Sequence, residues 1–471
     1  MKGIALDSRK VEPGDLFVAV PGSKADGRDF VEDARARGAV AVVAREPTPA
    51  PTLVVENPRA AAARLAAALY DHPAERIRLI GVSGTLGKTS TAFLLRDIMA
   101  AAGEDLGLIG SLGIRYGDTS LDTGMTTPDA PALQEALSAI ADKGIRAAAM
   151  EVTSHALVQN RLEGISLKIG LMTNLVPDEH LEFHETPDDY LRAKVRYFDM
   201  LESGAPLVIN ADDALLREHT GALGRPVVAV TATGRDGAAV QVEDLVVDPR
   251  GSRFRLRIAR PLMRLQGGAV QPSTIPVRLP VLGTPQVMNF ALAATLALMI
   301  GVTPDAVVRG ARRARPIRRR MEVVRDEGPI VLDDTVGHPR SLRAVFETVR
   351  LMKPSGRVHV IFGMRGMRGA TINRALGEAL ADLVSPPDTL VVTASEDCAG
   401  PRDRVQPDER SAFLEGLSAA GTPRFCFEPD LEGAIHRALK AVEPEDMVLL
   451  LGAQGMDRAA DLLRARLAAP A

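Results

Sequence analysis

The sequence predicts an α/β protein of three domains, and three observations support that fold class. First, strand-like runs alternate with helix-forming stretches along most of the 471 residues, as in a doubly wound, mostly parallel sheet. Second, a strand, a glycine-rich loop and a helix follow one another between residues 76 and 102, which is the order found in a P-loop domain. Third, an arginine-rich stretch containing Pro316 interrupts the pattern, and a fresh series of strands and helices follows it.

We therefore expect an N-terminal domain over residues 1–76, a central domain over residues 77–315 and a C-terminal domain over residues 316–471. The length agrees with this division, since a domain typically contains ~100–200 residues.

The N-terminal stretch has the pattern of a small α/β unit. Leu16–Val20 predicts a strand that Pro21-Gly22-Ser23 ends, and Ala39–Val43 predicts another. Residues 58 to about 70 predict a helix that closes the unit.

In the central stretch, residues 76–82 predict a buried strand and residues 91–102 the helix after the loop. Further strands are expected at residues 147–152, 169–174 and 207–210. Residues 240–282 differ, because polar and apolar residues alternate, as in Phe254-Arg255-Leu256-Arg257-Ile258. That pattern predicts a small antiparallel insertion. A helix is expected next, at residues 289–300.

Beyond the arginine-rich linker, a third domain with a Rossmann-like α/β pattern is expected. Its strands are predicted at residues 330–332, 358–362, 390–393 and 447–451, with helices between them.

Composition argues against several classes of partner. The chain has 57 basic and 60 acidic residues, a net charge of −3, which gives no electrostatic basis for binding nucleic acid or an anionic membrane surface. The most apolar stretch, residues 288–302, is shorter than the ~20 residues of a membrane-spanning helix, and the first residues contain no apolar run fit for a signal peptide. Cys398 and Cys426 show neither metal-type spacing nor a disulfide framework, so a reducing cytoplasm is expected.

The loop Gly84-Thr85-Leu86-Gly87-Lys88-Thr89-Ser90 carries the clearest chemistry. Backbone N–H groups at a helix N-terminus bind phosphate oxygens, a lysine adds a point charge, and the hydroxyl after it can ligate magnesium. The stricter form of this motif has glycine where Val82 stands, so only the shorter form is present. A chance glycine turn is the alternative, and the strand before and helix after the loop argue against it.

Two further groups of polar residues follow predicted strands. Glu151 ends the strand at 147–152, where a carboxylate faces the ligand crevice of a parallel sheet, although an ion pair at a strand end would have the same pattern. The segment 173–184 contains two histidines and three acids, a cluster that suggests a metal or substrate site.

Taken together and in this order, the motifs resemble those of the Mur ligase family, and within it the tripeptide synthetases. The resemblance rests on the loop, on Met150–Leu157, on Thr173–His184 and on Tyr190–Lys194, and it covers nearly the whole chain. Its N-terminal part is carried by Asp7-Ser8-Arg9, Gly14-Asp15-Leu16-Phe17 and Asp26-Gly27, and its substrate side by Thr126-Thr127-Pro128-Asp129.

The resemblance implies ATP and Mg²⁺ as cofactors and gives residues to each role. The ATP-binding residues would be Gly84, Thr85, Gly87, Lys88, Thr89, Ser90, Asn289, Arg320 and Asp334. The magnesium-associated residues would be Thr89, Glu151, His180 and Lys194, and the catalytic residues Lys88, Glu151, His180 and Lys194. Lys194 matches the lysine that family members carbamylate, and a carbamate suits a hard cation better than an ammonium group.

The resemblance also implies a UDP-muramoyl-peptide-like acceptor and an incoming amino acid, with neither nucleic acid nor membrane insertion, in a monomer or weak homo-oligomer. The substrate-binding residues would be Ser8, Arg9, Thr126, Thr127, Ser154, Gln159 and Arg161. The implied reaction forms an acyl phosphate from the acceptor carboxylate and ATP, which the amino acid then attacks.

Several positions depart from the family pattern. Leu86 and Met125 stand where asparagine is usual, Arg319 replaces a glycine, and one extra residue precedes His180. The Asp-Asn-Pro-Arg motif that selects diaminopimelate is absent, with residues 395–400 in its place, so we expect a different amino acid. The usual Lys-Gly-His-Glu is replaced by residues 454–457, in which Asp457 either keeps a carboxylate for an amine or caps a helix.

Two alternatives remain open. One is a ligase of this type with another carboxylate acceptor, outside the main cell-wall pathway. The other is a non-catalytic nucleotide-binding paralogue, against which the retained phosphoryl-transfer residues speak. Folylpolyglutamate synthetase shares the ATPase core, but Asp7-Ser8-Arg9 and the separate N-terminal unit argue against it.

Overall fold

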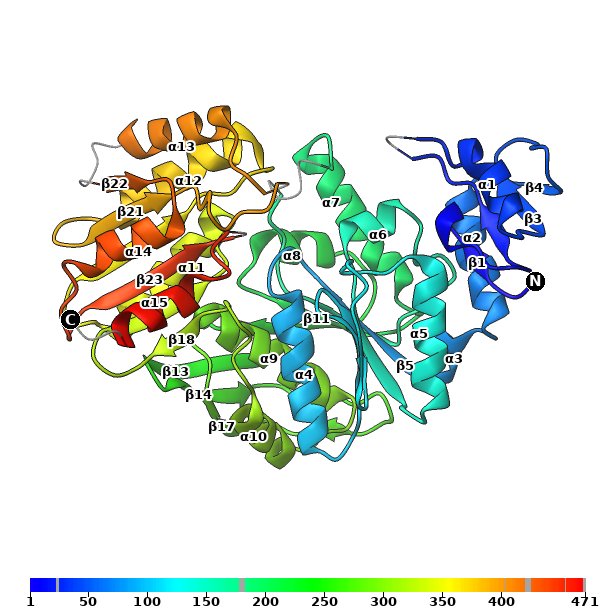
Figure 1. Cartoon of the computed structure of the whole chain (residues 1–471). Coiled ribbons are helices and arrows are strands. Elements are labelled where there is room, and N and C mark those ends of the chain that lie inside the picture. The colour runs from blue at the N-terminus through cyan, green and yellow to red at the C-terminus, as the bar shows by residue number, and fades with distance from the viewer. Residues whose placement is uncertain (23–24, 178–182, 402, 420–424, 454, 469–471) are drawn as a thin grey trace.

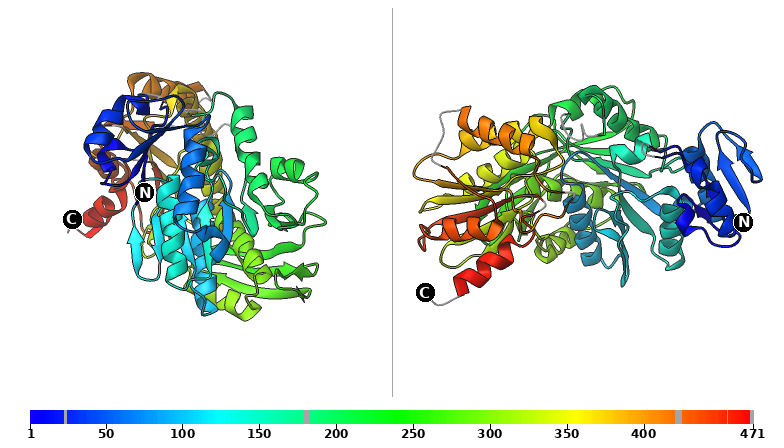
Figure 2. Two further views of the ribbon diagram at one scale, coloured as in Figure 1. Left: turned by 90° about the vertical axis from the view of Figure 1, so that its right-hand side faces the viewer. Right: turned by 45° about the horizontal axis from the view of Figure 1, so that its top comes forward.

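The computed structural model describes residues 1–22, 25–177, 183–401, 403–419, 425–453 and 455–468. Three large sheets follow one another along the chain, and the N-terminal and C-terminal sheets lie at opposite ends of the central one (Figures 1 and 2). The mixed α/β class with a large, mostly parallel central sheet is as predicted.

The N-terminal sheet has four parallel strands in the order β1-β2-β3-β4. They are β1 (Ile4–Ala5), β2 (Leu16–Val18), β3 (Ala41–Ala44) and β4 (Thr52–Val54). Its helices are η1 (Ser8–Lys10), η2 (Gly27–Phe30), α1 (Val31–Ala36) and α2 (Pro58–Leu69). Asn57 caps α2 by accepting the Ala60 N–H, and Pro58 occupies the first turn, where its missing N–H costs nothing.

The central sheet has eleven strands, in the order β17-β14-β13-β12-β11-β10-β5-β9-β6-β7-β8. The strands from β13 to β6 are parallel, and both edges are antiparallel. They are β5 (Arg78–Ser83), β6 (Gly107–Gly110), β7 (Gly113–Tyr116), β8 (Thr119–Leu121), β9 (Ala147–Glu151), β10 (Ile169–Met172), β11 (Leu207–Asn210), β12 (Val227–Thr231), β13 (Val240–Asp248), β14 (Gly251–Ile258) and β17 (Ser273–Leu279). The antiparallel strands expected at 240–282 are present, and they extend the main sheet through the pairing of β13 with β12. A hairpin of β15 (Leu262–Met263) and β16 (Ala269–Val270) lies beside them in the sequence.

Helices of this region are α3 (Pro73–Arg76), α4 (Lys88–Ala101), α5 (Ala130–Asp142), α6 (Ser154–Val158), α7 (Pro187–Val195), η3 (Arg196–Met200), α8 (Ala214–Thr220), α9 (Thr284–Met299) and α10 (Pro304–Arg313). Every residue from Val287 to Met299 is buried, which explains why α9 is apolar on all sides. In the described part of the chain, no helix is both long and apolar enough to cross a bilayer.

The C-terminal sheet has the order β18-β19-β23-β20-β21-β22, and only β18 is antiparallel. Its strands are β18 (Glu322–Arg325), β19 (Ile330–Asp334), β20 (Val358–Gly363), β21 (Thr389–Thr393), β22 (Phe425–Glu428) and β23 (Met447–Gly452). Its helices are α11 (Pro339–Met352), α12 (Gly369–Leu383), α13 (Pro407–Ala419), α14 (Leu431–Leu439) and α15 (Ala459–Ala468). The four strands predicted here are all present, within two residues at each end.

Candidate active site

The glycine-rich loop joins β5 to α4, and two glycines give it its shape. Gly84 has a φ of +128° and Gly87 a φ of +86°, in a region that favours glycine. A Cβ on Gly84 would lie 2.0 Å from the Thr173 hydroxyl oxygen, so no side chain fits there. Because α4 begins at Lys88, the loop leads into a helix N-terminus, where the helix dipole favours anions.

Asn174, just after β10, fixes the loop from the neighbouring strand. Its side chain accepts the Leu86 N–H at 2.9 Å and donates to the Leu86 carbonyl at 3.0 Å, while its carbonyl accepts the Thr85 N–H at 3.0 Å. Leu86 therefore contributes its backbone to this contact, which explains how leucine is tolerated where asparagine is usual. No role was predicted for Asn174, although it ends the strand that was predicted at residues 169–174.

Lys88 lies over the loop. Its Nζ donates to the carbonyl oxygens of Gly84 at 3.0 Å and Thr85 at 2.8 Å, which keeps the ammonium group beside the backbone that would surround a phosphate.

Glu151 ends β9 and is 2% exposed. Its carboxylate accepts the Thr89 hydroxyl at 3.0 Å, the Ser111 N–H at 3.1 Å and the Ser111 hydroxyl at 3.3 Å. Burial raises the pKa of Glu151, and the charge of Lys88 and these hydrogen bonds oppose that rise. The structure therefore brings together two of the predicted metal-associated residues, and it adds Ser111.

Lys194 projects from α7 into the same place and is 1% exposed. Its Nζ donates to the Gly84 carbonyl at 2.8 Å and lies 3.4 Å from the Ser83 hydroxyl. Burial, and after it the charge of Lys88, lower the pKa of Lys194 well below its usual value, while Glu151 opposes the shift. Both effects disfavour the charged ammonium form of Lys194 and so favour the neutral, nucleophilic amine.

The donors at this place fit magnesium in part. The Thr89 hydroxyl and the Glu151 carboxylate are the hard oxygen ligands that Mg²⁺ prefers, whereas an unmodified lysine is not a ligand for it. His180, the remaining predicted residue, lies outside the described residues. Among the residues that the structure describes, no three His, Cys, Asp or Glu side chains form a group that could hold a metal ion.

Most predicted substrate residues gather at the end of β9. The Thr127 hydroxyl donates to the Glu151 carbonyl at 2.8 Å, and the Arg161 guanidinium donates to the Thr127 carbonyl at 2.6 Å. The hydroxyl oxygens of Thr126 and Ser111 lie 2.9 Å apart, within hydrogen-bond distance. The side-chain oxygen of Gln159 accepts a hydrogen bond of 2.6 Å from the Arg161 guanidinium.

Ser154 and His184 form a hydrogen-bonded pair beside this group, with 2.9 Å between the hydroxyl oxygen and Nε2. Ser8 and Arg9 lie on η1 of the N-terminal sheet, where Ser8 is buried and Arg9 forms an exposed ion pair with Asp7.

Two of the remaining predicted nucleotide residues lie beside the loop or the first turn of α4. A Cβ on Gly87 would lie 2.6 Å from the Asn289 side-chain oxygen, so Asn289 packs directly on the loop. Ser90 and Arg320 line one small cavity together with Gln286.

Asp334, at the end of β19, accepts the Met321 N–H at 2.7 Å. Burial raises the pKa of Asp334 to about 6, and the charge of Arg320 opposes that rise.

Three family models match the chain along its length. The model described as "Mur ligase family, catalytic domain" matches residues 1–88, "Mur ligase middle domain" matches residues 82–297, and "Mur ligase, glutamate ligase domain" matches residues 319–454.

Similar curated proteins and a similar solved structure agree with these family matches. The UDP-N-acetylmuramoyl-L-alanyl-D-glutamate–2,6-diaminopimelate ligase of Rhizobium meliloti (strain 1021) is 36% identical over 457 residues, covering 96% of this chain and 88% of that protein. The UDP-N-acetylmuramyl-tripeptide synthetase of Roseiflexus sp. (strain RS-1) is 35% identical over 478 residues, covering 96% and 89%. A solved structure of a UDP-N-acetylmuramoyl-L-alanyl-D-glutamate–2,6-diaminopimelate ligase superposes with a TM-score of 0.67 at 25% identity, covering 100% of this chain and 96% of that one.

Proposed function

The chain belongs to the Mur ligase family, and from that premise we propose that it is an ATP-dependent, ADP-forming ligase in peptidoglycan precursor synthesis. It joins an amino acid to the terminal carboxylate of a UDP-N-acetylmuramoyl-peptide. The relatives named for this reaction match almost the full length of the chain.

One observation carries the proposal: Lys88, Lys194 and the Thr89–Glu151 pair converge on a single loop. Both lysines donate to the Gly84 carbonyl, and Thr89 donates to Glu151. A site that only held a nucleotide would need the loop alone. A buried carboxylate and a second, buried lysine beside it suit a site that does more than bind a nucleotide and supports phosphoryl transfer.

Each residue has a role in the proposed reaction. The loop N–H groups and Lys88 hold the β- and γ-phosphates and balance the charge that develops on them. Thr89 and Glu151 would hold Mg²⁺, and the bound ion would neutralise phosphate charge further. Asn289, Arg320 and Asp334 bind the rest of the nucleotide.

The chemistry follows in two steps. The acceptor carboxylate attacks the γ-phosphorus, forming an acyl phosphate and releasing ADP. The amine of the incoming amino acid then attacks the acyl carbon, and inorganic phosphate leaves from the tetrahedral intermediate. Thr126, Thr127, Ser154, Gln159 and Arg161 orient the acceptor, and Ser8 and Arg9 bind its uridine-nucleotide end.

We further propose that Lys194 is carbamylated. Only a neutral amine reacts with CO₂, and the lowered pKa of Lys194, which is caused first by burial, favours that form. The product is an anion with two oxygen atoms, which suits magnesium where the ammonium group does not. His180 is proposed to complete this group.

The proposed function also gives a role to each predicted domain. Residues 1–76, 77–315 and 316–471 form domains for the uridine nucleotide, for ATP and for the amino acid. The protein works in the cytoplasm as a monomer or weak homo-oligomer. The amino acid differs from diaminopimelate, because residues 395–400 replace the motif that selects it.

The test is phosphate release from ATP with UDP-N-acetylmuramoyl-dipeptide across a panel of amino acids. We expect release that requires both the acceptor and one class of amino acid. Release with a different carboxylate acceptor would support a ligase outside the main pathway. No release with any amine would contradict the proposal.

A further inference from the structure

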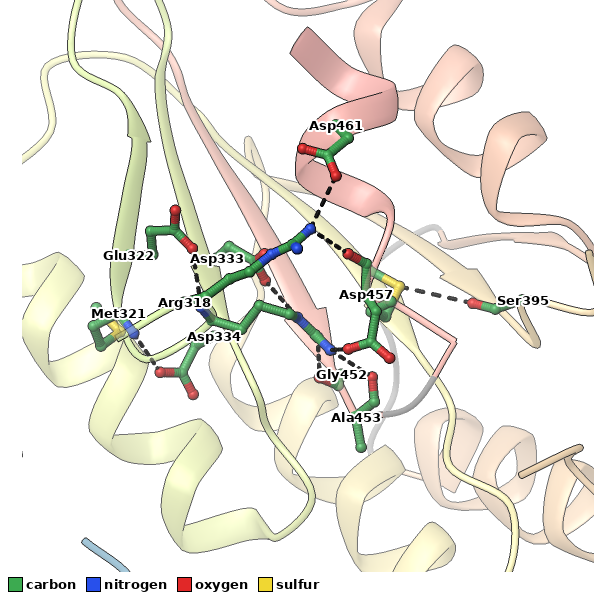
Figure 3. Close-up of polar contacts among 12 residues, drawn as sticks. Arg318, Met321, Glu322, Asp333, Asp334, Ser395, Gly452, Ala453, Asp457 and Asp461 are labelled. Atoms are coloured by element: carbon green, nitrogen blue, oxygen red, sulfur yellow. Dashed lines mark hydrogen bonds and ion pairs between the residues drawn. The ribbon is translucent and has the colours of Figure 1, made fainter. Parts of the chain in front are cut away.

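The linker that leads into the C-terminal sheet carries two adjacent arginines, and both reach the turn that follows β23 (Figure 3). Arg318 donates to the Asp457 carbonyl and to the Asp461 carboxylate, each at 2.9 Å. The linker is therefore attached to the last turn of the sheet before α15.

Arg319 is the buried member of the pair, with a side chain that is 6% exposed. Its guanidinium donates to the carbonyl oxygens of Gly452 at 2.6 Å and Ala453 at 2.9 Å, to Asp457 Oδ1 at 2.6 Å and to Asp333 Oδ1 at 3.2 Å. Its φ of +58° lies in the left-handed region, which disfavours residues other than glycine. The four contacts compensate for that backbone cost.

Asp457 occupies a place where a ligand-binding carboxylate is expected. It follows the carboxyl end of β23, and ligands of open α/β sheets bind beyond the carboxyl ends of the parallel strands. Its side chain is 70% exposed, so an incoming ammonium group could reach it. Asp333, the other acid that Arg319 contacts, is 1% exposed and belongs to β19.

Arg319 is already the cationic partner of Asp457. An ammonium group on the same carboxylate would lie next to the guanidinium and share one negative charge with it, which like-charge repulsion disfavours. The planar guanidinium is anchored by two backbone carbonyls, so it cannot move aside without leaving buried groups unpaired.

We propose that the ion pair with Arg319 prevents Asp457 from binding an ammonium group of the substrate. This ligase therefore adds an amino acid with one ammonium group and discriminates against diamino acids. Arg319 is thus a specificity-determining residue that acts through Asp457. The inference rests on the proposed function and deepens it by assigning the class of amino acid.

The experiment compares substrates that differ only in a second ammonium group: lysine against norleucine, and diaminopimelate against 2-aminopimelate. For the wild-type protein we expect kcat/KM to favour the monoamino member of each pair by at least tenfold. Asp457→Asn, at an exposed position, is expected to leave the KM for the monoamino acid within twofold.

Arg319→Gly frees Asp457 and is expected to shift the ratio toward the diamino member by about tenfold. The double variant Arg319→Gly/Asp457→Asn is expected to reverse that shift. A wild-type preference for diamino acids, or a tenfold rise in the amino-acid KM in Asp457→Asn, would overturn the inference.

Calorimetric binding of the same pairs, with ADP and Mg²⁺ present, separates this inference from the proposed function. If no amine releases phosphate, the proposed function fails, and the binding data still decide the role of Arg319. Arg319→Gly must then bind the diamino member more tightly than the wild type does, in a way that Asp457→Asn removes. Absence of that gain in a folded variant overturns the inference.

Discussion

Lys194 donates a hydrogen bond of 2.8 Å to the carbonyl oxygen of Gly84, the first residue of the phosphate-binding loop, although 110 positions separate them. The same carbonyl accepts from Lys88 at 3.0 Å. Two lysine side chains thus meet at one carbonyl oxygen, and only Lys194 is fully buried. The charge of Lys88 adds to burial in lowering the pKa of Lys194.

Replacing Lys194 by alanine is therefore expected to abolish ATP-dependent ligation while sparing the fold. We expect phosphate release to fall more than 100-fold, roughly the effect of removing one preorganised electrostatic group. Affinity for ADP should stay within about threefold, since the loop itself is intact. Lys168→Ala is the matched control, because Lys168 is exposed and paired with Glu202. Unchanged phosphate release in Lys194→Ala would contradict the assigned role.

Carbamylation of Lys194 gives a separate expectation. Protein incubated with ¹³C-bicarbonate should show one carbamate resonance by NMR, and Lys194→Ala should lack it. Because burial lowers the pKa of Lys194, the signal should appear under less alkaline conditions than an ordinary lysine would need. Full activity in buffer depleted of CO₂ would exclude a requirement for the modification.

Glu151→Gln tests the magnesium site. The substitution keeps the shape and an oxygen for Ser111, but it removes the charge that a divalent ion requires. We expect kcat/KM to fall about 100-fold and the Mg²⁺ concentration for half-maximal rate to rise. Ser111→Ala is the control, because its backbone N–H still donates to Glu151, and it should change both quantities by less than fivefold. An unchanged Mg²⁺ requirement in Glu151→Gln would mean that the ion is held elsewhere.

Substitutions at Asn174 and at Leu86, which contact each other, are expected to differ strongly in their effect on the KM for ATP. Asn174→Ala removes the donor and the acceptor that hold the Leu86 backbone, so the KM for ATP should rise at least tenfold. Leu86→Asn restores the residue usual in the family and should leave the KM for ATP within threefold, since only the backbone at position 86 takes part. Steady-state kinetics with ATP varied measures both. A larger effect from Leu86→Asn than from Asn174→Ala would contradict this account of the loop.

Local sequence patterns were sufficient for the elements whose signals are local. The strand at 207–210 was predicted at its observed bounds, and α2 begins at Pro58, where the helix was predicted to begin. The hairpin of β6 and β7 was not predicted, because Gly107–Gly110 contains two glycines, which weaken any strand signal. Ser111 follows that hairpin's first strand, and its contact with Glu151 was missed for the same reason.

Lys194 shows why the site could not be assembled from local pattern. It lies on a helix with Asp188, Asp189 and Arg192, which has the composition of a solvated surface. Its burial comes from packing beside residues 83 and 84, which are distant in the sequence, so only the family resemblance pointed to it. The contacts of Arg319 were equally hidden, since three of its four partners lie at the end of β23 or just after it, more than 130 positions away.

Because the pKa of Asp334 is raised, we expect nucleotide binding to depend on pH. Its pKa is raised to about 6 by burial, so it is ionised at pH 7.5 and mostly protonated at pH 5.5. If it accepts a hydrogen bond from the nucleotide, ADP affinity should fall several-fold between those values. Asp334→Asn should bind ADP weakly at both values, with a flat profile. Calorimetry at pH 5.5, 6.5 and 7.5 measures this, and an equal pH dependence in the variant would remove Asp334 from the nucleotide site.

The ionisation of Asp446 is expected to make the stability of the C-terminal sheet depend on pH. Burial raises the pKa of Asp446, but hydrogen bonds from the Glu443 N–H, from His359 and from the Arg357 N–H outweigh burial and lower it to about 2. The ordinary value is near 4, so folding favours the ionised form. Its stabilising contribution is complete above pH ~5 and is lost as the pH falls through 4 toward 2.

Asp446→Asn should therefore lower the free energy of unfolding by about 1–3 kcal/mol at pH 7. Each carboxylate oxygen of Asp446 accepts a hydrogen bond from a backbone N–H group. In asparagine an NH₂ group replaces one of these oxygens, so one N–H donor would face another donor and lose its acceptor. The difference from the wild type should narrow below about pH 4, where the carboxyl group of the wild type begins to take up its proton. Asp388→Asn is the matched control, because one oxygen suffices for its bond from the Val358 N–H. Urea unfolding followed by circular dichroism between pH 7 and pH 3.5 measures both variants. A constant difference across that range would show that the ionisation of Asp446 does not stabilise the fold.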